Sequence, residues 1–308
     1  MVKAILILKK SGSCRYYRIY NDEWGKEDIQ VGIVSYLTAI TSIITELGET
    51  SPKNLEFEDF EIICETKNDY ILAIVKDQHT KQSVVKRVKN EFKNNFHPLV
   101  NEDELNSLLA EESFLLKEKK YISRFARHLN LIINKRVKLE TEIAVESKDE
   151  DSDALLISDV DLLIATSSGQ PVYIMTTLLL PYDAVLFSSF VSAILDLGQL
   201  IGIGKLKKIE GEKLTIYFKV IQRAFAIVIT QNKNQKKAYQ RFAEFVAEVC
   251  NDWLSFDSDG VEEAFEIFEN RKHFEQMLQM ILDSETWEKH LIKEQEREII
   301  AIQTIENI

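Results

Sequence analysis

Two uncharged and nearly identical hexamers, SYLTAI at residues 35–40 and SFVSAI at residues 189–194, occur in the two halves of this 308-residue chain. They lie 154 positions apart, and sliding the chain by that offset brings other segments into register. DYILAIVKD at 69–77 then lies over RAFAIVITQ at 223–231. Self-similarity at one offset indicates that the chain is a tandem repeat of two similar modules.

Near the beginning of each half, a glycine marks a predicted β-hairpin turn. LILKKSG at 6–12 resembles LIATSSG at 163–169, with an offset of 157 that a three-residue difference in loop length explains. An apolar strand pattern precedes both Gly12 and Gly169, and a second strand pattern follows each of them. We therefore expect the two glycines to occupy equivalent turns.

Each half has the predicted order β-β-α-β-β-β-α-α. Short connections make neighbouring strands antiparallel, and the first helix of each half carries the one long crossover. The predicted fold class is therefore α+β, with a five-stranded antiparallel sheet in each module and helices on both faces. The expected strands are 2–8, 16–20, 54–58, 60–65, 70–76, 161–166, 171–176, 205–209, 213–220 and 224–230. The expected helices are 27–48, 81–95, 183–202 and 235–253.

This order resembles the longin and roadblock superfamily. The resemblance is carried by ISDVDLLIATSSGQPVYI at 157–174, FSSFVSAILDLGQLIGIGKLKKIE at 187–210 and KLTIYFKVIQRAFAIVIT at 213–230. It implies a five-stranded sheet with one long helix on one face and C-terminal helices on the other, and modules that work in pairs. The start on a strand favours longin over roadblock. The nearest similarity is to longin-like proteins of archaea that have eukaryote-like small GTPases.

The chain divides into four parts at changes in composition. Residues 140–153 contain seven acidic residues and one lysine, which predicts a solvated, flexible linker that proteases cut first. The first module with a helical extension, 1–139, precedes this linker, and the second module, 154–256, follows it. Residues 257–308 are expected to form a C-terminal helical extension.

The first long helix of each half lacks the charged face of an ordinary surface helix. No charged residue stands between Asp28 and Glu46, and none stands from Ala184 to Leu195. We expect each helix to be buried by its own sheet and by a partner, with the two helices at or near the contact between modules. The alternative is cover from the module's own C-terminal extension. The residues assigned to this interface, between modules or with a partner, are Ser35, Tyr36, Ala39, Ile43, Ser189, Phe190, Ala193 and Leu197.

A charge buried at the centre of such a contact should separate the modules without unfolding them. Ala39 and Ala193 are small, central and equivalent, so arginine at either position is expected to give a more extended particle with its secondary structure intact.

Composition excludes several classes of protein. The formal net charge of −12 argues against a nucleic-acid partner, which needs a dominantly basic surface. Cys14, Cys64 and Cys250 form no CxxC pair and fit a reducing cytosol. No window of about 18 residues is uninterruptedly apolar, so a membrane-spanning helix is not expected. We expect a cytoplasmic protein, and peripheral contact with a membrane stays open.

No residue constellation for covalent chemistry is found in the sequence. The five histidines show no HxxxH or HExxH spacing, which argues against zinc. GQLIGIGK at 198–205 follows a helix and lacks GK[ST], so its glycines indicate a helix end and not a phosphate-binding loop. SKDEDSD at 147–153 lacks the glycine and the distal glutamate of an EF-hand loop. Ser188, Ser189 and Ser192 have no local His or Asp arrangement, so no catalytic, metal or cofactor site is expected.

One basic segment, KEKKYISRFARHLNLIINKRVK at 117–138, stands out in this acidic chain. It carries Tyr121, Phe125, Leu129 and Ile132 at helical spacing. We favour a helix that docks on the first module by this stripe, and the alternative is a helix that contacts a membrane surface or an acidic partner. The residues assigned to that acidic-surface contact are Lys119, Lys120, Arg124, Arg127, Lys135 and Arg136.

The resemblance implies a function as well as a fold. It points to a non-enzymatic adaptor or regulator that binds a small GTPase in a trafficking-like system, as an exchange or activating platform without a catalytic motif of its own. Two alternatives are a tether or coat-like scaffold, and a ligand sensor that uses a pocket between helix and sheet. A sensor should show a sizeable pocket with convergent polar groups. A GTPase platform should instead expose a surface built by the paired modules.

Overall fold

The structure is a computed structural model, and it describes residues 2–20, 27–49, 51–96, 122, 125, 129, 157–178, 180, 182–220, 224–231, 238–246, 271–282 and 284–293. The strands of the first half are β1 (Val2–Lys9), β2 (Cys14–Ile19), β3 (Asn54–Phe57), β4 (Phe60–Lys67) and β5 (Tyr70–Asp77). The strands of the second half are β6 (Val160–Thr166), β7 (Pro171–Met175), β8 (Leu206–Glu210), β9 (Thr215–Val220) and β10 (Ala224–Thr230). The described helices include α1 (Glu27–Glu46), α2 (Gln82–Asn95), α4 (Ala184–Leu200) and α6 (Arg271–Ile281).

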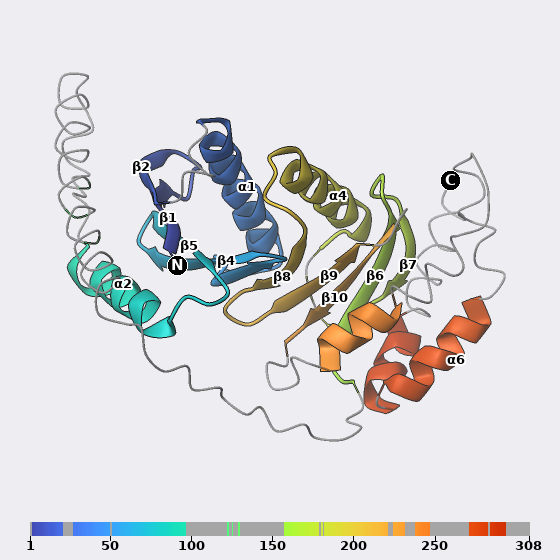
Figure 1. Ribbon diagram of the computed structural model, residues 1–308. Coiled ribbons are helices and arrows are strands. Elements are labelled where there is room, and N and C mark those ends of the chain that lie inside the picture. Colours follow the sequence, from blue (N-terminus) through green and yellow to red (C-terminus); the bar gives the residue numbers. More distant parts are fainter. Residues whose placement is uncertain are drawn as a thin grey trace, which may run out of the picture.

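The ten described strands form one antiparallel sheet in the order β2-β1-β5-β4-β3-β8-β9-β10-β6-β7 (Figure 1). The predicted α+β class and the antiparallel pairing are thereby confirmed. The order β2-β1-β5-β4-β3 in the first half matches β7-β6-β10-β9-β8 in the second, so the internal repeat is visible in the topology. The sequence analysis placed five strands in a sheet of their own in each half. The structure instead joins the strands of both halves into one sheet.

The joint between the halves is the pair of strands β3 and β8. Leu55 lies opposite Ile209, and Glu56 lies opposite Lys208. The side chains of this second pair also form an ion pair with 2.6 Å between the ammonium and the carboxylate. Each of the two strands would otherwise be an open edge with unpaired backbone groups, and pairing satisfies both at once.

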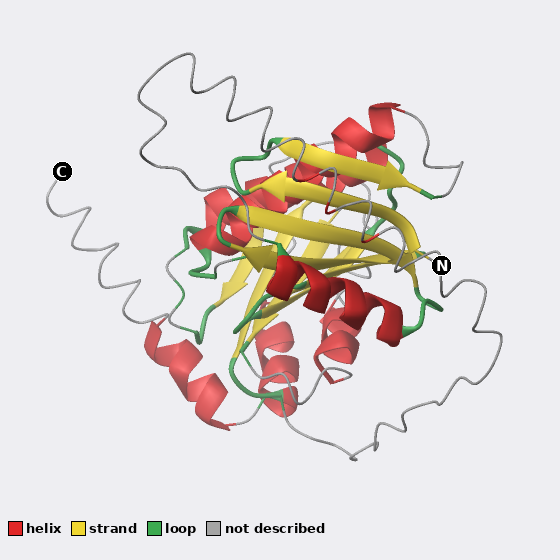
Figure 2. Ribbon diagram, turned by 90° about the vertical axis from the view of Figure 1, so that its left-hand side faces the viewer, coloured by secondary structure: helices red, strands yellow, loops and turns green. Residues whose placement is uncertain are grey.

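The two faces of the sheet are covered differently. α1 and α4 lie side by side on one face (Figure 1), over a single apolar cluster with residues from both halves. The opposite face carries two separate clusters, one that includes residues of α2 and one that includes residues of α6. Figure 2 shows the sheet between these helix layers. Because both faces are covered, β5 and β10 are apolar along nearly their whole length.

One group of aromatic residues of the first half lies on the face opposite to α1. Phe92 of α2 stacks on Phe96 with ring centroids 4.6 Å apart, and the ring of Phe125 lies 5.2 Å from that of Phe96. Phe125 and Leu129 are buried in the same cluster. At these two positions, the basic segment docks on the first half as we favoured.

The prediction of equivalent hairpin turns is confirmed. Gly12 and Gly169 have φ values of +90° and +86°, a region that L-residues with a side chain rarely adopt. Both glycines donate their N–H to the last residue of the preceding strand, the Lys9 carbonyl in one turn and the Thr166 carbonyl in the other. The two turns therefore have the same hydrogen-bond pattern despite their different sequences.

Candidate protein-interaction surface

α1 and α4 are held in equivalent positions by the residues at their ends. Asp183 caps α4 by accepting the N–H of Leu186 at 2.9 Å. Both helices then end at a glycine in the left-handed region, Gly48 and Gly202, and the N–H that follows each glycine returns to a carbonyl of the last turn. Each helix therefore ends at a defined residue, after which the chain leads into β3 or β8.

In each half, the tip of the β-hairpin contacts the long helix of the same half at the repeated hexamer. A Cβ atom on Gly12 would lie 2.9 Å from the side chain of Thr38, and one on Gly169 would lie 2.7 Å from the Cα of Ser189. Ser192, at the position equivalent to Thr38, donates a hydrogen bond to a carbonyl of the hairpin tip at 2.5 Å. Ser189, which we assigned to the interface, and the small residues Thr38 and Ser192 therefore contact the hairpin tip of their own half.

Glycines make the contact between α1 and α4. A Cβ atom on Gly32 would lie 2.7 Å from the Cγ2 of Ile201, and one on Gly198 would lie 3.2 Å from the ring of Tyr36. The backbone of each helix therefore touches a side chain of the other helix directly. Since Gly32 and Tyr36 meet Ile201 and Gly198, the N-terminal part of α1 lies against the C-terminal end of α4.

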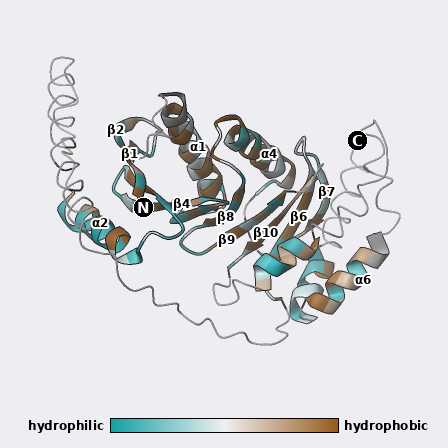
Figure 3. Cartoon of the chain, in the orientation of Figure 1, coloured by the Kyte–Doolittle hydropathy of each residue, from teal (hydrophilic) through white to brown (hydrophobic). Residues whose placement is uncertain are grey.

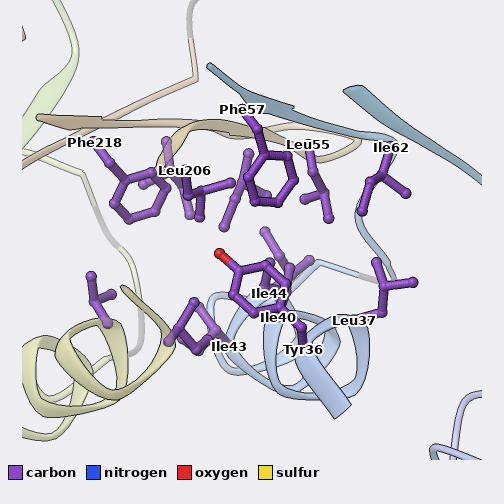
Figure 4. Packing of buried hydrophobic residues seen from close by; sticks show 14 of the residues in the cluster. Tyr36, Leu37, Ile40, Ile43, Ile44, Leu55, Phe57, Ile62, Leu206 and Phe218 are labelled. Atoms are coloured by element: carbon purple, nitrogen blue, oxygen red, sulfur yellow. The ribbon is translucent and has the colours of Figure 1, made fainter. Parts of the chain in front are cut away.

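Tyr36 fills the space between this contact and the sheet. Its side chain is fully buried, and Figure 4 shows it beneath the sheet with Leu206 and Phe218 on the side of its hydroxyl group. The hydroxyl group has no hydrogen-bond partner in the described part of the chain. Burial raises the pKa of Tyr36 far above its usual value, so the phenol stays neutral. Tyr36 therefore acts as a packing residue that links α1 to strands of the second half.

Glu49 ties the end of α1 to the turn between β8 and β9. Its carboxylate accepts the N–H groups of Glu212 at 3.0 Å, Lys213 at 2.5 Å and Leu214 at 2.6 Å. Only 5% of the residue is exposed. A Cβ atom on Gly211 would lie 3.0 Å from the carboxylate carbon, so a side chain there would press against the carboxylate. These charge-assisted bonds hold the two halves together independently of the strand pairing.

The eight residues that we assigned to an interface fall into three groups. Tyr36 and Ile43 are buried, and Figure 4 places Ile43 on the side of α1 that faces α4. Ala39 and Leu197 are half-buried and contact the same cluster. The exposed members are Ser35, Ser189, Phe190 and Ala193. Their contact with a partner stays a prediction.

The outer face of α1 and α4 is exposed, largely uncharged and without basic residues. Neither helix contains Lys or Arg. Both helices are largely hydrophobic in Figure 3, whereas α2 is mostly hydrophilic. Exposed apolar patches are typical of protein and membrane interaction sites, so this face is the candidate surface. Where the structure describes side chains of the two helices, the exposed large apolar residues are Val31, Val185, Leu186, Phe190 and Leu200.

Several assigned residues lie outside the part of the chain that the structure describes. They include the linker 140–153 and the module boundaries next to it and at 256–257. They also include the six basic residues Lys119, Lys120, Arg124, Arg127, Lys135 and Arg136.

The opposite face of the sheet carries a small polar cavity. It has a volume of about 120 Å³ and lies between β3, β8, β9 and the helical residues 238–246. Lys208 and Glu56 line it, and they already pair with each other. Its volume is well below the several hundred Å³ of a typical small-molecule pocket. Among the described residues, no three His, Cys, Asp or Glu side chains are grouped so that they could hold a metal ion.

Three residues that build this surface were not assigned from the sequence. Gly32 carries a recognisable signal, because a glycine inside a helix costs about 1 kcal/mol relative to alanine and so indicates close packing. Gly198 was assigned to the helix end, a role that the structure gives to Gly202. Glu49 carries no signal, since an acidic residue just after a helix ordinarily faces water.

Comparison with protein-family models and with curated proteins returned no match for this chain. Within the described residues, no helix has the length and apolarity that crossing a bilayer would require.

Proposed function

We propose that the chain consists of two longin-like modules and acts as a non-enzymatic platform that binds a small GTPase in a trafficking-like system. The modules are 1–139 and 154–256, with the linker 140–153 between them and a helical extension at 257–308. Support for the modules comes from the strand order that the two halves share and from the helices on both faces of the sheet. The partner class rests on the resemblance of the sequence to the longin and roadblock superfamily.

One observation carries the placement of the partner on α1 and α4. The two helices of different halves contact each other, and together they expose apolar side chains with no basic residue among them. A partner on this surface would contact both halves, so its binding would depend on their pairing. We propose a cytoplasmic location, with peripheral contact to a membrane through the partner or the basic segment.

A tether or coat-like scaffold would use the same surface and is the second candidate. It differs from a GTPase platform in one measurable property, because its binding would not depend on the nucleotide. A ligand sensor is less well supported, since the polar cavity described above is small. A second hollow, of about 350 Å³, is lined among the described residues by α2 alone and not by helix and sheet together.

The test measures binding of the small GTPases encoded in the same genome to the immobilised full chain. Each GTPase is loaded with GDP or with a non-hydrolysable GTP analogue, and exchange and hydrolysis rates are recorded with and without the chain. We expect nucleotide-dependent binding that Phe190→Glu weakens at least tenfold. Met280→Glu, at an apolar residue of α6 that is 73% exposed, is the control. Nucleotide-independent binding would favour the scaffold, and absence of binding would overturn the proposal.

A further inference from the structure

The two helices of the pair are not equivalent, although the repeat aligns them residue by residue. Gly32 and Tyr36 of α1 are buried. Leu186 and Phe190, at the equivalent positions of α4, are 53% and 41% exposed. One half therefore places its aromatic residue inside the molecule, whereas the other half leaves it on the surface.

The residues opposite these aromatic rings explain the difference. Tyr36 lies against Gly198, which offers no side chain. The residue of α1 equivalent to Gly198 is Ile44, whose side chain is fully buried in the core. Phe190 therefore has no matching space in the first half and stays outside, within an exposed row of three residues. We call this row the α4 stripe: Leu186, Phe190 and Ala193.

The α4 stripe has the spacing of one helical face. Its members are four and three residues apart, so they lie on one side of α4 over about 10 Å. This length and the i, i+4, i+7 spacing fit two turns of a second helix packed across α4. The stripe is continuous with the α1–α4 contact, because Leu197 extends it by one turn into the shared core.

The charged residues that the structure describes on α4, at its cap and at the end of α1 are acidic. Asp183 and Asp196 are exposed at the two ends of the stripe, and Glu46 is exposed at the end of α1 that lies nearer the start of α4. The neighbouring hairpin tip, residues 167–170, is uncharged. A second copy of this chain would set these carboxylates against each other, and an anionic membrane would be repelled by them.

We propose that the α4 stripe binds a single amphipathic helix of a partner protein, whose apolar row is flanked by Lys or Arg. Each chain binds one helix, because the residues at the equivalent positions of α1 are buried or half-buried and offer no second docking site. This inference rests on the proposed function in using α1 and α4 as the docking surface, and it adds the chemistry of the contact. It does not depend on the partner being a GTPase.

The test uses a labelled helical peptide of leucine and lysine, about four turns long, with leucine at i, i+3 and i+4 spacing. The same peptide with glutamate in place of lysine is the charge control. Fluorescence anisotropy with the full chain at physiological ionic strength should show saturable one-to-one binding of the lysine peptide only. Equal binding of the glutamate peptide would overturn the proposal.

Phe190→Glu should weaken the lysine peptide at least tenfold, although the new carboxylate adds attraction for lysine. Met280→Glu is the matched control, because Met280 is 73% exposed on α6, away from α1 and α4, and the charge change is the same. Circular dichroism confirms the fold of both variants. An equal effect of the two variants, or none, would contradict the α4 stripe as the site.

The remaining outcomes separate the other occupants. Self-association of the chain that Phe190→Glu abolishes would assign the stripe to a second copy and overturn the proposal. Binding to phosphatidylserine vesicles that the same variant abolishes would assign it to a membrane, with the same consequence. Peptide binding without any GTPase binding would keep this inference and reject the partner class. If a GTPase binds and Phe190→Glu does not change that binding, while the peptide does not bind, the partner class is kept and this inference is rejected.

Discussion

Glu49 and Asp161 are both buried carboxylates, but they bind different parts of the backbone. Glu49 accepts three N–H groups from the other half of the chain. Asp161 accepts the N–H groups of Thr177 at 2.6 Å and Leu178 at 2.8 Å, and so holds the segment that leads into α4. A buried charge is costly unless its environment supplies such bonds, so each carboxylate fixes the backbone that surrounds it.

Replacing Glu49 by alanine should destabilise the chain by about 2 kcal/mol or more, because buried N–H groups of the β8–β9 turn would lose their acceptor. Urea unfolding at neutral pH measures this loss. Glu46→Ala is the control, since Glu46 is exposed near the end of the same helix. A loss no larger than that of the control would show that the N–H groups find water instead.

Asp161 should make stability depend on pH in an unusual direction. Burial raises its pKa from 3.8 to about 6, against the opposing effect of its hydrogen bonds. A carboxyl with a raised pKa stabilises the fold while it is protonated, so its contribution is present below about pH 4 and lost as the pH rises through about 6. The interval between the two pKa values corresponds to about 3 kcal/mol.

Asp161→Asn should remove this dependence, because the amide oxygen can still accept both N–H groups. The variant should therefore gain stability relative to the wild type as the pH rises from 4 to 7. Urea unfolding across that range checks it. Asp159→Asn is the neighbouring control, whose carboxylate lies on the surface and pairs with Lys289 at 3.2 Å. Parallel pH profiles for wild type and Asp161→Asn would contradict the role assigned to burial.

At the scale of elements, α1 shows how a helix with an uncharged surface satisfies its exposed polar groups. Exposed hydroxyl groups of α1 bond back to carbonyls of the preceding turn, as Thr45 does to Thr41 at 2.7 Å and Ser42 does to Thr38 at 3.2 Å. The helix therefore needs neither a charged face nor a partner to satisfy these groups. The lack of charged residues led us to expect that each helix is buried on two sides. The structure instead leaves one side of each helix exposed.

The contact of α1 with α4 should be sensitive to any side chain at Gly32. Gly32→Leu should destabilise the chain by about 1–3 kcal/mol, since the new side chain meets Ile201 directly. Ser35→Leu introduces the same side chain at an exposed position of the same helix and should change stability little. Thermal unfolding followed by circular dichroism compares the two variants. Similar melting temperatures would mean that the helices separate without cost.

The expected effect of arginine in the hexamer changes with these positions. Ala193 is exposed, so an arginine there reaches water and should leave both the fold and the compactness unchanged. Ala39 is half-buried against the shared core, so Ala39→Arg should be the more destabilising of the two. Small-angle scattering and urea unfolding of both variants check this. A more extended particle for Ala193→Arg would contradict the exposed position.

At the scale of the whole molecule, the sequence predicted the elements well and their assembly only in part. Gly12 and Gly169 predicted two equivalent hairpins because each turn needs a positive φ, which is a local requirement. The joint through β3 and β8 was not predicted. Leu55 and Phe57 alternate with polar residues in the same way whether the strand is an edge or the centre of a larger sheet. The shape of the α1–α4 contact likewise depends on Gly198 facing Tyr36, a pairing between residues that lie far apart in the sequence.

Three separate contacts should hold the halves together after the connection between them is cut. They are the β3–β8 ladder, the Glu49 carboxylate on the β8–β9 turn, and the glycine contact of α1 with α4. A specific protease site inserted within 140–153 tests this on the full chain. We expect both fragments to elute together in size-exclusion chromatography and to unfold in a single transition. The cut makes joining the halves bimolecular, so this transition should depend on protein concentration, and Glu49→Ala should shift it to lower urea concentration. Fragments that separate in the wild type would show that the single sheet forms only while the linker holds the halves near each other.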